Sequence, residues 1–376
     1  MKNILVLSPF CKSQQIKNSH GLDKYFNQLF NVINNNFKDQ FNCVILGNQK
    51  CICTNNKCFQ FKNYFYDKYS ESRNLISKSL YSIFLFFYVS KLNKFIKKIN
   101  PSLVINNYFF HIKSKNTIWV QHSSPEAYKG TLFKSKLFNL FSYFIKKISR
   151  TATPWKFANY IVNYTKYDES NFKTNSNFFR KRFFIPLALP KHDINYSLDT
   201  KKNIKPFVFI NRLAPQKKTS YLVEVARFLD EKFQMSIDVY GWGEEQALVL
   251  DKPGINYLGK LDNDKAKEIL RNYKIFILTS DYEGFSYSAL EAMAQGTFVI
   301  ARNTYPSLKY LLDNNRGLMI HKDTGPEAFA DEMINAYNMN LEQCKKDCIR
   351  FVSDNLIYEV FEEKWKYVIS FCMSNQ

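Results

Sequence analysis

Short apolar segments alternate along the chain with longer segments that have the periodicity of helices. In the first half, helical patterns occur at Leu22–Ile33 and Leu75–Ile99. The apolar segments around them, which predict buried strands, are Ile4–Leu7, Cys43–Leu46, Leu103–Asn106, Thr117–Val120, Tyr160–Asn163 and Phe183–Ile185. Strands that alternate with helices indicate a parallel sheet covered by helices.

The same alternation begins again after a polar segment, residues 191–205, where we place an interdomain linker. The predicted strands of this second series are Phe207–Asn211, Ser236–Tyr240, Ile255–Leu258, Ile275–Thr279 and Phe298–Ala301. The predicted helices are Ser220–Lys232, Lys265–Asn272, Ser288–Gln295, Pro326–Tyr337 and Leu356–Met373, the last with one apolar stripe. The pattern therefore predicts an N-terminal domain over residues 1–190, a C-terminal domain over residues 206–355, and a C-terminal helix over residues 356–376 that returns toward the N-terminal domain.

The length of 376 residues suits two domains, and a hydrophobic fraction of 45% is ordinary for a folded protein. The charge is distributed unevenly. Residues 1–200 hold 30 Lys and Arg against 9 Asp and Glu, whereas residues 201–376 hold 23 against 24. A basic half suggests an anionic partner, either a membrane surface or a nucleic acid, although a lysine-rich proteome would produce the same bias.

One basic segment has the pattern of a helix that lies on an anionic membrane surface. Its apolar residues share one helical face: Leu137, Leu140, Phe141, Phe144, Ile145 and Ile148. The surrounding charges are all basic: Lys134, Lys136, Lys146, Lys147 and Arg150. The segment Lys78–Lys98 is a second aromatic and basic stretch. A helix that faces the domain core would show the same apolar stripe.

Eight cysteines are scattered without a disulfide framework, which indicates a reducing cytosol. Cys51, Cys53 and Cys58 lack a fourth ligand at zinc spacing, so we interpret them as free thiols. The first residues predict a strand rather than a signal peptide. No apolar run approaches the ~20 residues that a membrane-spanning helix needs.

The segment from Asp281 to Gly296 combines two carboxylates with a glycine turn and the start of a helix. Glu283 and Glu291 flank the turn, which follows the predicted strand Ile275–Thr279. Open α/β sheets bind ligands at the carboxyl ends of their strands. A helix N-terminus in that place offers free N–H groups and the positive end of a dipole to an anion.

Four short motifs occur in the order found in one enzyme family. They are Asn211–Lys217, similar to G-R-L-x-x-x-K, Val239–Gly243, similar to V-x-G-x-G, Tyr257–Gly259, similar to F-L-G, and Glu283–Glu291, similar to E-G-F-x-x-x-x-x-E. The chain thus resembles the retaining GT-B glycosyltransferases of group 1, also called family 4, over residues 206–320 and only in outline before them. The resemblance implies an α/β fold of two Rossmann-like domains that face each other across a cleft. In this family the C-terminal domain holds a nucleotide-sugar and the N-terminal domain holds the acceptor.

The resemblance implies four catalytic residues. Retaining transfer breaks the bond between an anomeric carbon and a diphosphate, so negative charge develops on the leaving phosphate and preorganised donors must stabilise it. The resemblance assigns Arg212 and Lys217 to the diphosphate and Glu283 to the transferred sugar. It also places His122, which follows a predicted strand, against the sugar. Taken alone, two basic loop residues would be solvated and a histidine at a strand end would be structural.

The resemblance also implies a set of donor-binding residues. It assigns the ribose hydroxyls to Glu291, which would also complete a capping box begun by Ser288. Gly284 would permit close approach of the backbone to a ligand. The other donor-binding candidates are Gly21 in a loop near the diphosphate, Gly241 on the nucleotide side, Gly259 and Lys260 near the base, and Phe285, Ser286 and Tyr287 with N–H groups that point toward a phosphate.

The sequence Asp262-Asn263-Asp264 is similar to a metal-binding Asp-x-Asp motif. It immediately precedes a predicted helix, so we interpret it as an N-cap. Arg212 and Lys217 would supply the positive charge, and we expect neither a metal nor another cofactor.

We therefore expect a cytoplasmic enzyme of the hexosyltransferase type, peripheral on the inner face of the plasma membrane. It would transfer a sugar from a nucleoside diphosphate sugar to a lipid-linked or cell-surface glycan acceptor of the lipopolysaccharide or polysaccharide type. Its partners would be the donor, the acceptor and an anionic membrane, but no nucleic acid. The alternatives are a basic nucleic-acid-binding protein, a non-catalytic GT-B scaffold in a glycan assembly complex, and an enzyme with a soluble acceptor.

Overall fold

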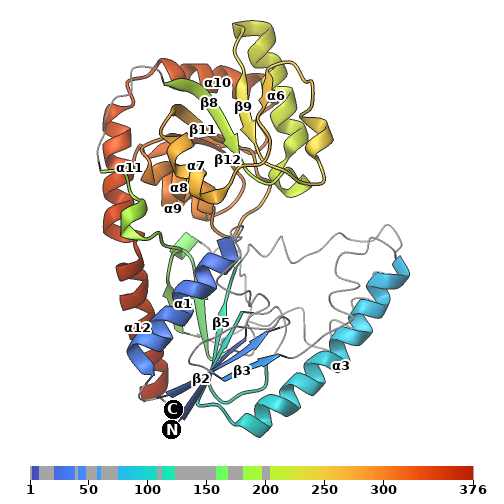
Figure 1. Cartoon of the computed structure of the whole chain (residues 1–376), viewed down its shortest axis with the longest axis vertical. Coiled ribbons are helices and arrows are strands. Elements are labelled where there is room, and N and C mark those ends of the chain that lie inside the picture. The colour runs from blue at the N-terminus through green and yellow to red at the C-terminus, as the bar shows by residue number, and fades with distance from the viewer. Residues whose placement is uncertain are drawn as a thin grey trace. The chain divides into compact units, whose positions relative to one another are not determined.

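The computed structural model describes residues 2–7, 21–38, 41–47, 57–60, 75–107, 112–122, 158–167, 181–196 and 204–375. The chain divides into two compact units, each built around a parallel sheet (Figure 1). Unit 1 comprises Met1–Asn163, Lys173–Ile185 and Glu362–Gln376, and unit 2 comprises Tyr164–Phe172 and Pro186–Phe361.

The described part of unit 1 contains a seven-stranded sheet in the order β3-β2-β1-β4-β5-β6-β7, with every pair of neighbours parallel. The strands are β1 Lys2–Leu7, β2 Phe41–Gly47, β3 Lys57–Gln60, β4 Leu103–Asn106, β5 Thr117–Val120, β6 Tyr160–Asn163 and β7 Lys181–Phe184. All of the strands predicted for this half are present. The additional strand β3 was not predicted, because Lys-Cys-Phe-Gln has no apolar run.

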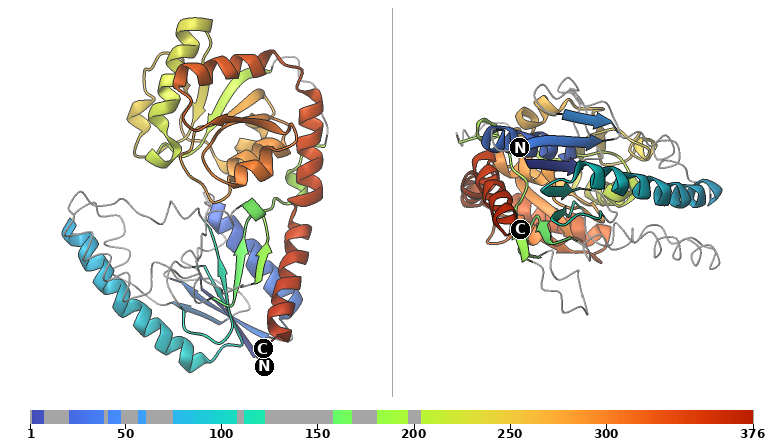
Figure 2. Two further views of the ribbon diagram at one scale, coloured as in Figure 1. Left: turned by 180° about the vertical axis from the view of Figure 1, so that it is seen from behind. Right: turned by 90° about the horizontal axis from the view of Figure 1, so that it is seen from below.

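Helices cover the unit 1 sheet on different sides (Figure 2). Helix α1 (Gly21–Phe37) buries Tyr25, Phe26, Leu29, Val32 and Ile33, and α3 (Leu75–Ile99) packs Leu92 and Ile96 against Leu5, Leu7 and Val104. Helix α12 (Tyr358–Ser374) buries the predicted stripe of Phe361, Trp365, Val368 and Ile369. The predicted interfacial helix at residues 137–148 lies outside the described residues.

Unit 2 contains a six-stranded parallel sheet in the order β10-β9-β8-β11-β12-β13. The strands are β8 Lys205–Ile210, β9 Ile237–Tyr240, β10 Ile255–Tyr257, β11 Tyr273–Leu278, β12 Phe298–Asn303 and β13 Gly317–His321. The helices are α6 Thr219–Phe233, α7 Asn263–Leu270, α8 Tyr287–Ala294, α9 Ser307–Leu312, α10 Pro326–Asn338 and α11 Glu342–Asn355. The central strands are buried on both faces, which accounts for their almost continuous apolar sequences.

Three elements of unit 2 were not predicted. Helix α9 is short, and β13 is only partly buried. The sequence of α11 is mostly polar, and Cys348, Ile349 and Val352 are its buried residues. These stretches lack the strong periodicity on which prediction from sequence depends.

The strand order of unit 2 reverses between β8 and β11. From β8 the chain continues outward through β9 and β10, whereas from β11 it continues in the opposite direction through β12 and β13. The loops that follow β8 and β11 therefore diverge at a topological switch point. Open α/β sheets bind ligands at the carboxyl ends of the strands on either side of such a point.

Candidate active site

The loops that follow β8 and β11 are joined by hydrogen bonds at the switch point of unit 2. The amide of Asp281 donates to the Gln216 carbonyl at 2.9 Å, and the Gln216 side-chain amide donates to the Tyr282 carbonyl at 2.9 Å. The Thr279 hydroxyl donates to the Lys217 carbonyl at 2.7 Å. Two of the motifs found in the sequence, more than sixty residues apart, therefore form one site.

The centre of this site is an ion pair between Lys217 and Glu283, formed by Nζ and Oε1. The two side chains are only 15% and 11% exposed. Glu283 also accepts a hydrogen bond from the Ser280 hydroxyl at 2.9 Å and one from the Gln216 amide at 3.4 Å. The structure thus brings Lys217, predicted to hold the diphosphate, into direct contact with Glu283, predicted to hold the sugar.

Arg212 lies on the same loop, between β8 and the turn that contains Lys217. Its side chain is exposed. Within the part of the chain that the structure describes, no carboxylate or carbonyl oxygen accepts a hydrogen bond from its guanidinium. A guanidinium presents a planar fork of donors that matches a phosphate, so Arg212 is available to an anionic ligand.

Helix α8 begins beside Glu283, and its N-cap is Ser286, whose hydroxyl accepts a hydrogen bond from the amide of Ala289 at 3.3 Å. The alternative of a capping box formed by Ser288 and Glu291 is therefore wrong, because Ser288 already lies inside the helix. Among the described residues, nothing accepts a hydrogen bond from the backbone N–H of Phe285 or Ser286. Such N–H groups at a helix N-terminus form a site for an anion.

Two further features belong to this helix start. Tyr287 is its first residue, and burial, together with the charge of Glu291, raises the pKa of the Tyr287 hydroxyl. Glu291 itself lies in the second turn of α8. Gly284 has no positive φ, unlike Gly259 and Gly296, so its backbone conformation does not by itself require glycine.

The glycine turn after β9 packs directly on the loop that carries Arg212. A Cβ atom on Gly241 would lie 1.9 Å from the Asn211 carbonyl oxygen, and one on Gly243 would lie 2.2 Å from that of Leu213. The Leu213 amide donates to the Trp242 carbonyl at 3.0 Å. The glycines are therefore needed for the close packing of two backbones, a role that the motif alone did not reveal.

The end of β10 lies next to this turn. The Gly241 amide donates to the Gly259 carbonyl at 2.9 Å, and Gly259 has a φ of 79°, which favours glycine. The ammonium of Lys260 lies 5.2 Å from the ring centre of Trp242, whose side chain is 52% exposed. Gly241, Gly259 and Lys260 thus belong to one edge of the site, with an exposed aromatic ring beside them.

Four residues around Glu283 were not identified from the sequence. Asp281 and Arg302 form an ion pair at 2.7 Å, and the Thr304 hydroxyl donates to the Ser280 carbonyl at 2.6 Å. Tyr305 is 3% exposed, and burial followed by the charge of Glu283 raises the pKa of its hydroxyl well above the usual value. The one available indication was that Arg302 directly follows the apolar run that predicts β12.

Comparison with protein families agrees with this geometry. The family model described as "Glycosyl transferases group 1" matches residues 191–350. This match covers less than half of the chain. All of the candidate site residues of unit 2 lie within this matched group 1 region.

A curated relative is the GtfA subunit of the UDP-N-acetylglucosamine–peptide N-acetylglucosaminyltransferase from Streptococcus pneumoniae. It is 23% identical over 197 residues, which cover 49% of this chain and 39% of the relative. The match thus spans well under half of the relative's length.

Solved structures extend the similarity beyond the group 1 region. A point mutant of TarM from S. aureus, in complex with fondaparinux, α-GlcNAc-glycerol and UDP, has a TM-score of 0.65 at 13% identity and covers 98% of this chain and 99% of its own. Sucrose-phosphate synthase from Thermosynechococcus elongatus has a TM-score of 0.70 at 13% identity and covers 100% of both chains. These similarities show the two-domain α/β fold of the GT-B glycosyltransferases.

The remaining catalytic candidate, His122, lies in unit 1 at the end of β5. It is 7% exposed, and its Nε2 lies 2.9 Å from Asn107 Oδ1. Because the Asn107 amide nitrogen donates to the Leu7 carbonyl at 2.9 Å, the Asn107 oxygen is the acceptor and His122 Nε2 carries the proton. The rings of Tyr25 and Phe26 pack against the imidazole, with ring centres 4.9 and 5.7 Å away.

Burial lowers the pKa of His122 to about 3. The imidazole is therefore neutral near pH 7, and its surroundings favour a structural role; its catalytic role stays a prediction. Gly21 is the first residue of α1. Ser19 and His20 lie outside the described residues, so the role of the Gly21 loop also stays a prediction.

The Asp-x-Asp segment does not precede α7 as predicted, because this helix begins at Asn263 and so includes Asn263 and Asp264. Asp262 occupies the N-cap position, but its side chain makes no capping hydrogen bond. The described residues contain no group of three or more His, Cys, Asp or Glu side chains that could hold a metal. Cys51 and Cys53 lie outside the described residues.

Proposed function

We propose that this protein is a retaining glycosyltransferase that uses a nucleoside diphosphate sugar. The observation that supports this most is the Lys217–Glu283 pair, because it joins the loop that carries Arg212 to the residues just before α8. Two cations on one loop and the free amides of Phe285 and Ser286 suit a diphosphate, whose leaving oxygen gains negative charge in the transition state. Because Arg212 and Lys217 supply positive charge there, we expect transfer without a metal or other cofactor.

The ion pair suggests how the donor enters the site. A diphosphate competes with Glu283 for the ammonium of Lys217, because both are anions and each can bind this cation. Once Lys217 turns to the phosphate, the Glu283 carboxylate can accept hydrogen bonds from sugar hydroxyls. Ser280 and Gln216 keep the carboxylate in place during this exchange, since both donate to it.

The relatives favour a uridine donor, whereas the acceptors differ, since the GtfA relative is named for a peptide acceptor. The GtfA relative is named for UDP-N-acetylglucosamine, and the TarM structure contains UDP and α-GlcNAc-glycerol. We therefore propose a UDP-sugar as donor. We propose a lipid-linked or cell-surface glycan precursor of the lipopolysaccharide or polysaccharide type as acceptor.

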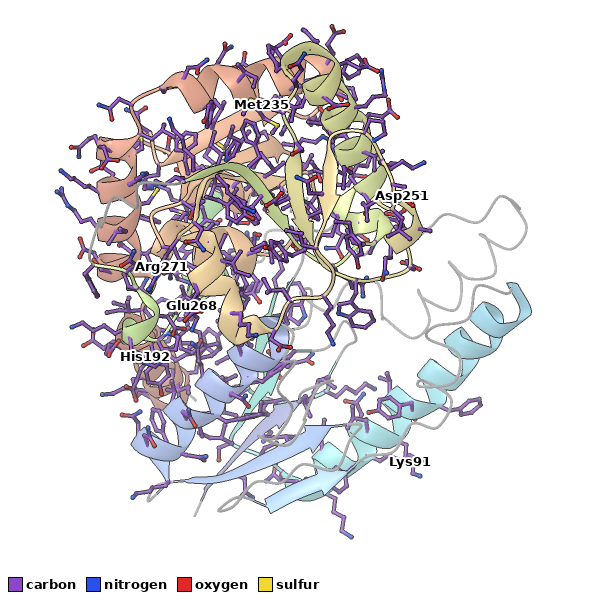
Figure 3. The ribbon with its side chains drawn as sticks, turned by 45° about the horizontal axis from the view of Figure 1, so that its top comes forward. Lys91, His192, Met235, Asp251, Glu268 and Arg271 are labelled. Carbon is purple, nitrogen blue, oxygen red and sulfur yellow. The ribbon has the colours of Figure 1, made fainter. Side chains whose placement is uncertain are left out.

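We also propose that unit 1 binds an anionic membrane on the cytoplasmic side. The outer face of α3 carries Phe87, 63% exposed, followed by the exposed residues Lys91, Lys94 and Lys98. Lys91 points outward from the helix (Figure 3). An aromatic ring flanked by lysines suits the boundary between headgroups and water. No helix in the described residues is long and apolar enough to cross a membrane.

A thermal-shift panel of UDP, GDP and ADP, followed by turnover of the matching sugar nucleotides, tests the proposal. A ligand that binds only the native protein raises its melting temperature. We expect UDP to raise it, and Lys217→Met to abolish that rise. Lys232→Met is the matched control, because this exposed lysine pairs with Asp331 at 2.6 Å on the outside of unit 2.

Two results would contradict the proposal. The first is a folded protein that none of the three nucleotides stabilises. The second is a duplex or single-stranded nucleic acid that binds at physiological salt more tightly than UDP, which would favour a nucleic-acid-binding protein.

A further inference from the structure

Contacts from the end of β12 converge on the loop that carries Glu283. The Arg302 guanidinium donates to Asp281 Oδ1 at 2.7 Å and to the Thr279 carbonyl at 3.2 Å. Two residues later, the Thr304 hydroxyl donates to the Ser280 carbonyl at 2.6 Å. Every one of these bonds ends on residues 279–281, immediately before Glu283.

Arg302 also contacts two other elements of unit 2. It is 8% exposed, its second terminal nitrogen donates to the Lys322 carbonyl at 2.8 Å, and its guanidinium lies 4.7 Å from the ring centre of Tyr221. Lys322 directly follows β13, and Tyr221 lies on α6. A planar guanidinium can make several such contacts at once, which a lysine ammonium cannot reproduce.

Asp281, which pairs with Arg302, also contacts the loop that follows β8. Its second carboxylate oxygen lies 3.3 Å from the Lys218 ammonium, and its amide donates to the Gln216 carbonyl at 2.9 Å. Lys217 lies between these two residues. Arg302 and Lys218 together balance the negative charge of Asp281. The ammonium of Lys217 can therefore pair with Glu283 rather than with Asp281.

We propose that Arg302 is a positioning residue for glycosyl transfer, which acts through Asp281 to hold Glu283 beside Lys217. This inference rests on the proposed function. A buried ion pair is weak evidence for a stabilising role, since desolvation offsets much of its attraction. The placement of the Arg302 bonds, all on the segment that leads to Glu283 or on neighbouring strand ends, fits control of geometry instead.

Arg302→Met is the first test, because it keeps much of the side-chain volume and removes the charge and the hydrogen bonds. We expect kcat for the sugar nucleotide that the wild-type protein turns over fastest to fall about 10- to 100-fold, since small displacements of catalytic groups have effects of this size. The Kd of UDP, measured by calorimetry, should change less than about threefold, because Arg212, Lys217 and the helix N-terminus are left in place.

Further variants separate positioning from stability. Asp281→Asn should also lower kcat, and the double variant should be no worse than the more impaired single variant, because the two residues act as one unit. Arg302→Lys should restore part of the loss. Thr304→Val removes one hydroxyl at nearly constant volume. It replaces Arg302→Met as the test variant if Arg302→Met does not fold. Arg227→Met is the control, since this arginine pairs with Glu231 at 2.7 Å on the exposed face of α6.

The inference is wrong if Arg302→Met turns over like the wild type, or if kcat, UDP affinity and melting temperature all fall in parallel, as a purely structural role would require. Additive losses in the double variant would also contradict it. A wild-type protein that neither binds UDP nor turns over any sugar nucleotide would instead overturn the proposed function, and the positioning role would fall with it.

Discussion

At the scale of single residues, the site depends on the ion pair between Lys217 and Glu283, whose side chains are both mostly buried. Glu283, Arg212 and Lys217 were found from motifs whose residue types suit a diphosphate and a sugar. The pairing of Lys217 with Glu283 joins positions 66 residues apart, and no local rule predicts such a contact. Arg302 was missed for the same reason, because its partner Asp281 lies on a different strand end.

The capping-box alternative at Glu291 shows how sensitive local rules are to register. Helix α8 begins at Tyr287 rather than Ser288, so the cap is Ser286 and its partner is the amide of Ala289. The N-cap thus lies two residues before Ser288, so Glu291 is not at the N3 position that a capping box requires. Helix boundaries carry this uncertainty in any sequence-based assignment.

The buried His122 leads to a prediction about pH. Its pKa falls from 6.5 to about 3 in the folded protein, so the unfolded chain binds the extra proton as pH decreases. Its contribution to stability is therefore complete above about pH 6.5 and is lost toward pH 3, at about 1.4 kcal/mol per pH unit. Between pH 6.5 and 5, we expect the wild type to lose about 2 kcal/mol more unfolding free energy than His122→Gln.

Urea denaturation of both proteins at the two pH values measures this difference. Equal losses in the wild type and His122→Gln would show that the histidine is not held neutral. A bell-shaped activity profile that loses one limb in this variant would support the catalytic assignment of His122 instead.

At the scale of elements, strands buried on both faces were the most predictable, because few structures besides a buried strand accommodate a short, continuous apolar run. Strands β4, β5 and β6 and helix α3 have the predicted bounds. The missed elements, β3, β13, α9 and α11, are short or mostly polar, so their formation depends on tertiary packing that single-sequence patterns do not contain.

The glycine turn after β9 gives a prediction at this scale. Gly241→Ala places a Cβ against the Asn211 carbonyl, where the separation would be 1.9 Å, so the two backbones must move apart. We expect a loss of at least about 2 kcal/mol in unfolding free energy, together with weaker UDP binding, because the displaced loop carries Arg212.

Gly325→Ala is the matched control for this change. Nothing lies within 4 Å of its added Cβ, and the φ of −68° is ordinary for alanine. Because Gly325 is the N-cap of α10, where alanine is less favourable than glycine, we expect a loss of no more than about 1 kcal/mol in unfolding free energy. Denaturation curves of the two variants decide the matter, and equal stability of both would refute the close packing of this turn.

At the scale of the whole molecule, alternation of strands and helices in two series predicted two α/β halves. The sheet orders could not be derived in this way, because nothing local in Phe207–Ile210 indicates that β8 lies between β9 and β11. The switch point, and hence the contact between the loops that follow β8 and β11, is therefore known only from the structure.

The uneven charge is the other whole-molecule feature, and it gives a prediction about membranes. Replacing Lys91, Lys94 and Lys98 by serine should weaken binding to vesicles rich in phosphatidylserine by about 3 kcal/mol at most, at about 1 kcal/mol per lysine. Co-sedimentation with anionic and neutral vesicles measures this, and UDP binding should be unchanged. Equal sedimentation of wild type and variant would remove α3 from any membrane contact.

The central claim is that a diphosphate binds to unit 2 between Lys217 and the start of α8. A crystal structure of the protein with UDP tests it most directly. We predict that the diphosphate contacts Arg212 and the amides of Phe285 and Ser286, and that Lys217 turns away from Glu283 to contact it. A nucleotide bound elsewhere, with the Lys217–Glu283 pair intact, would contradict it.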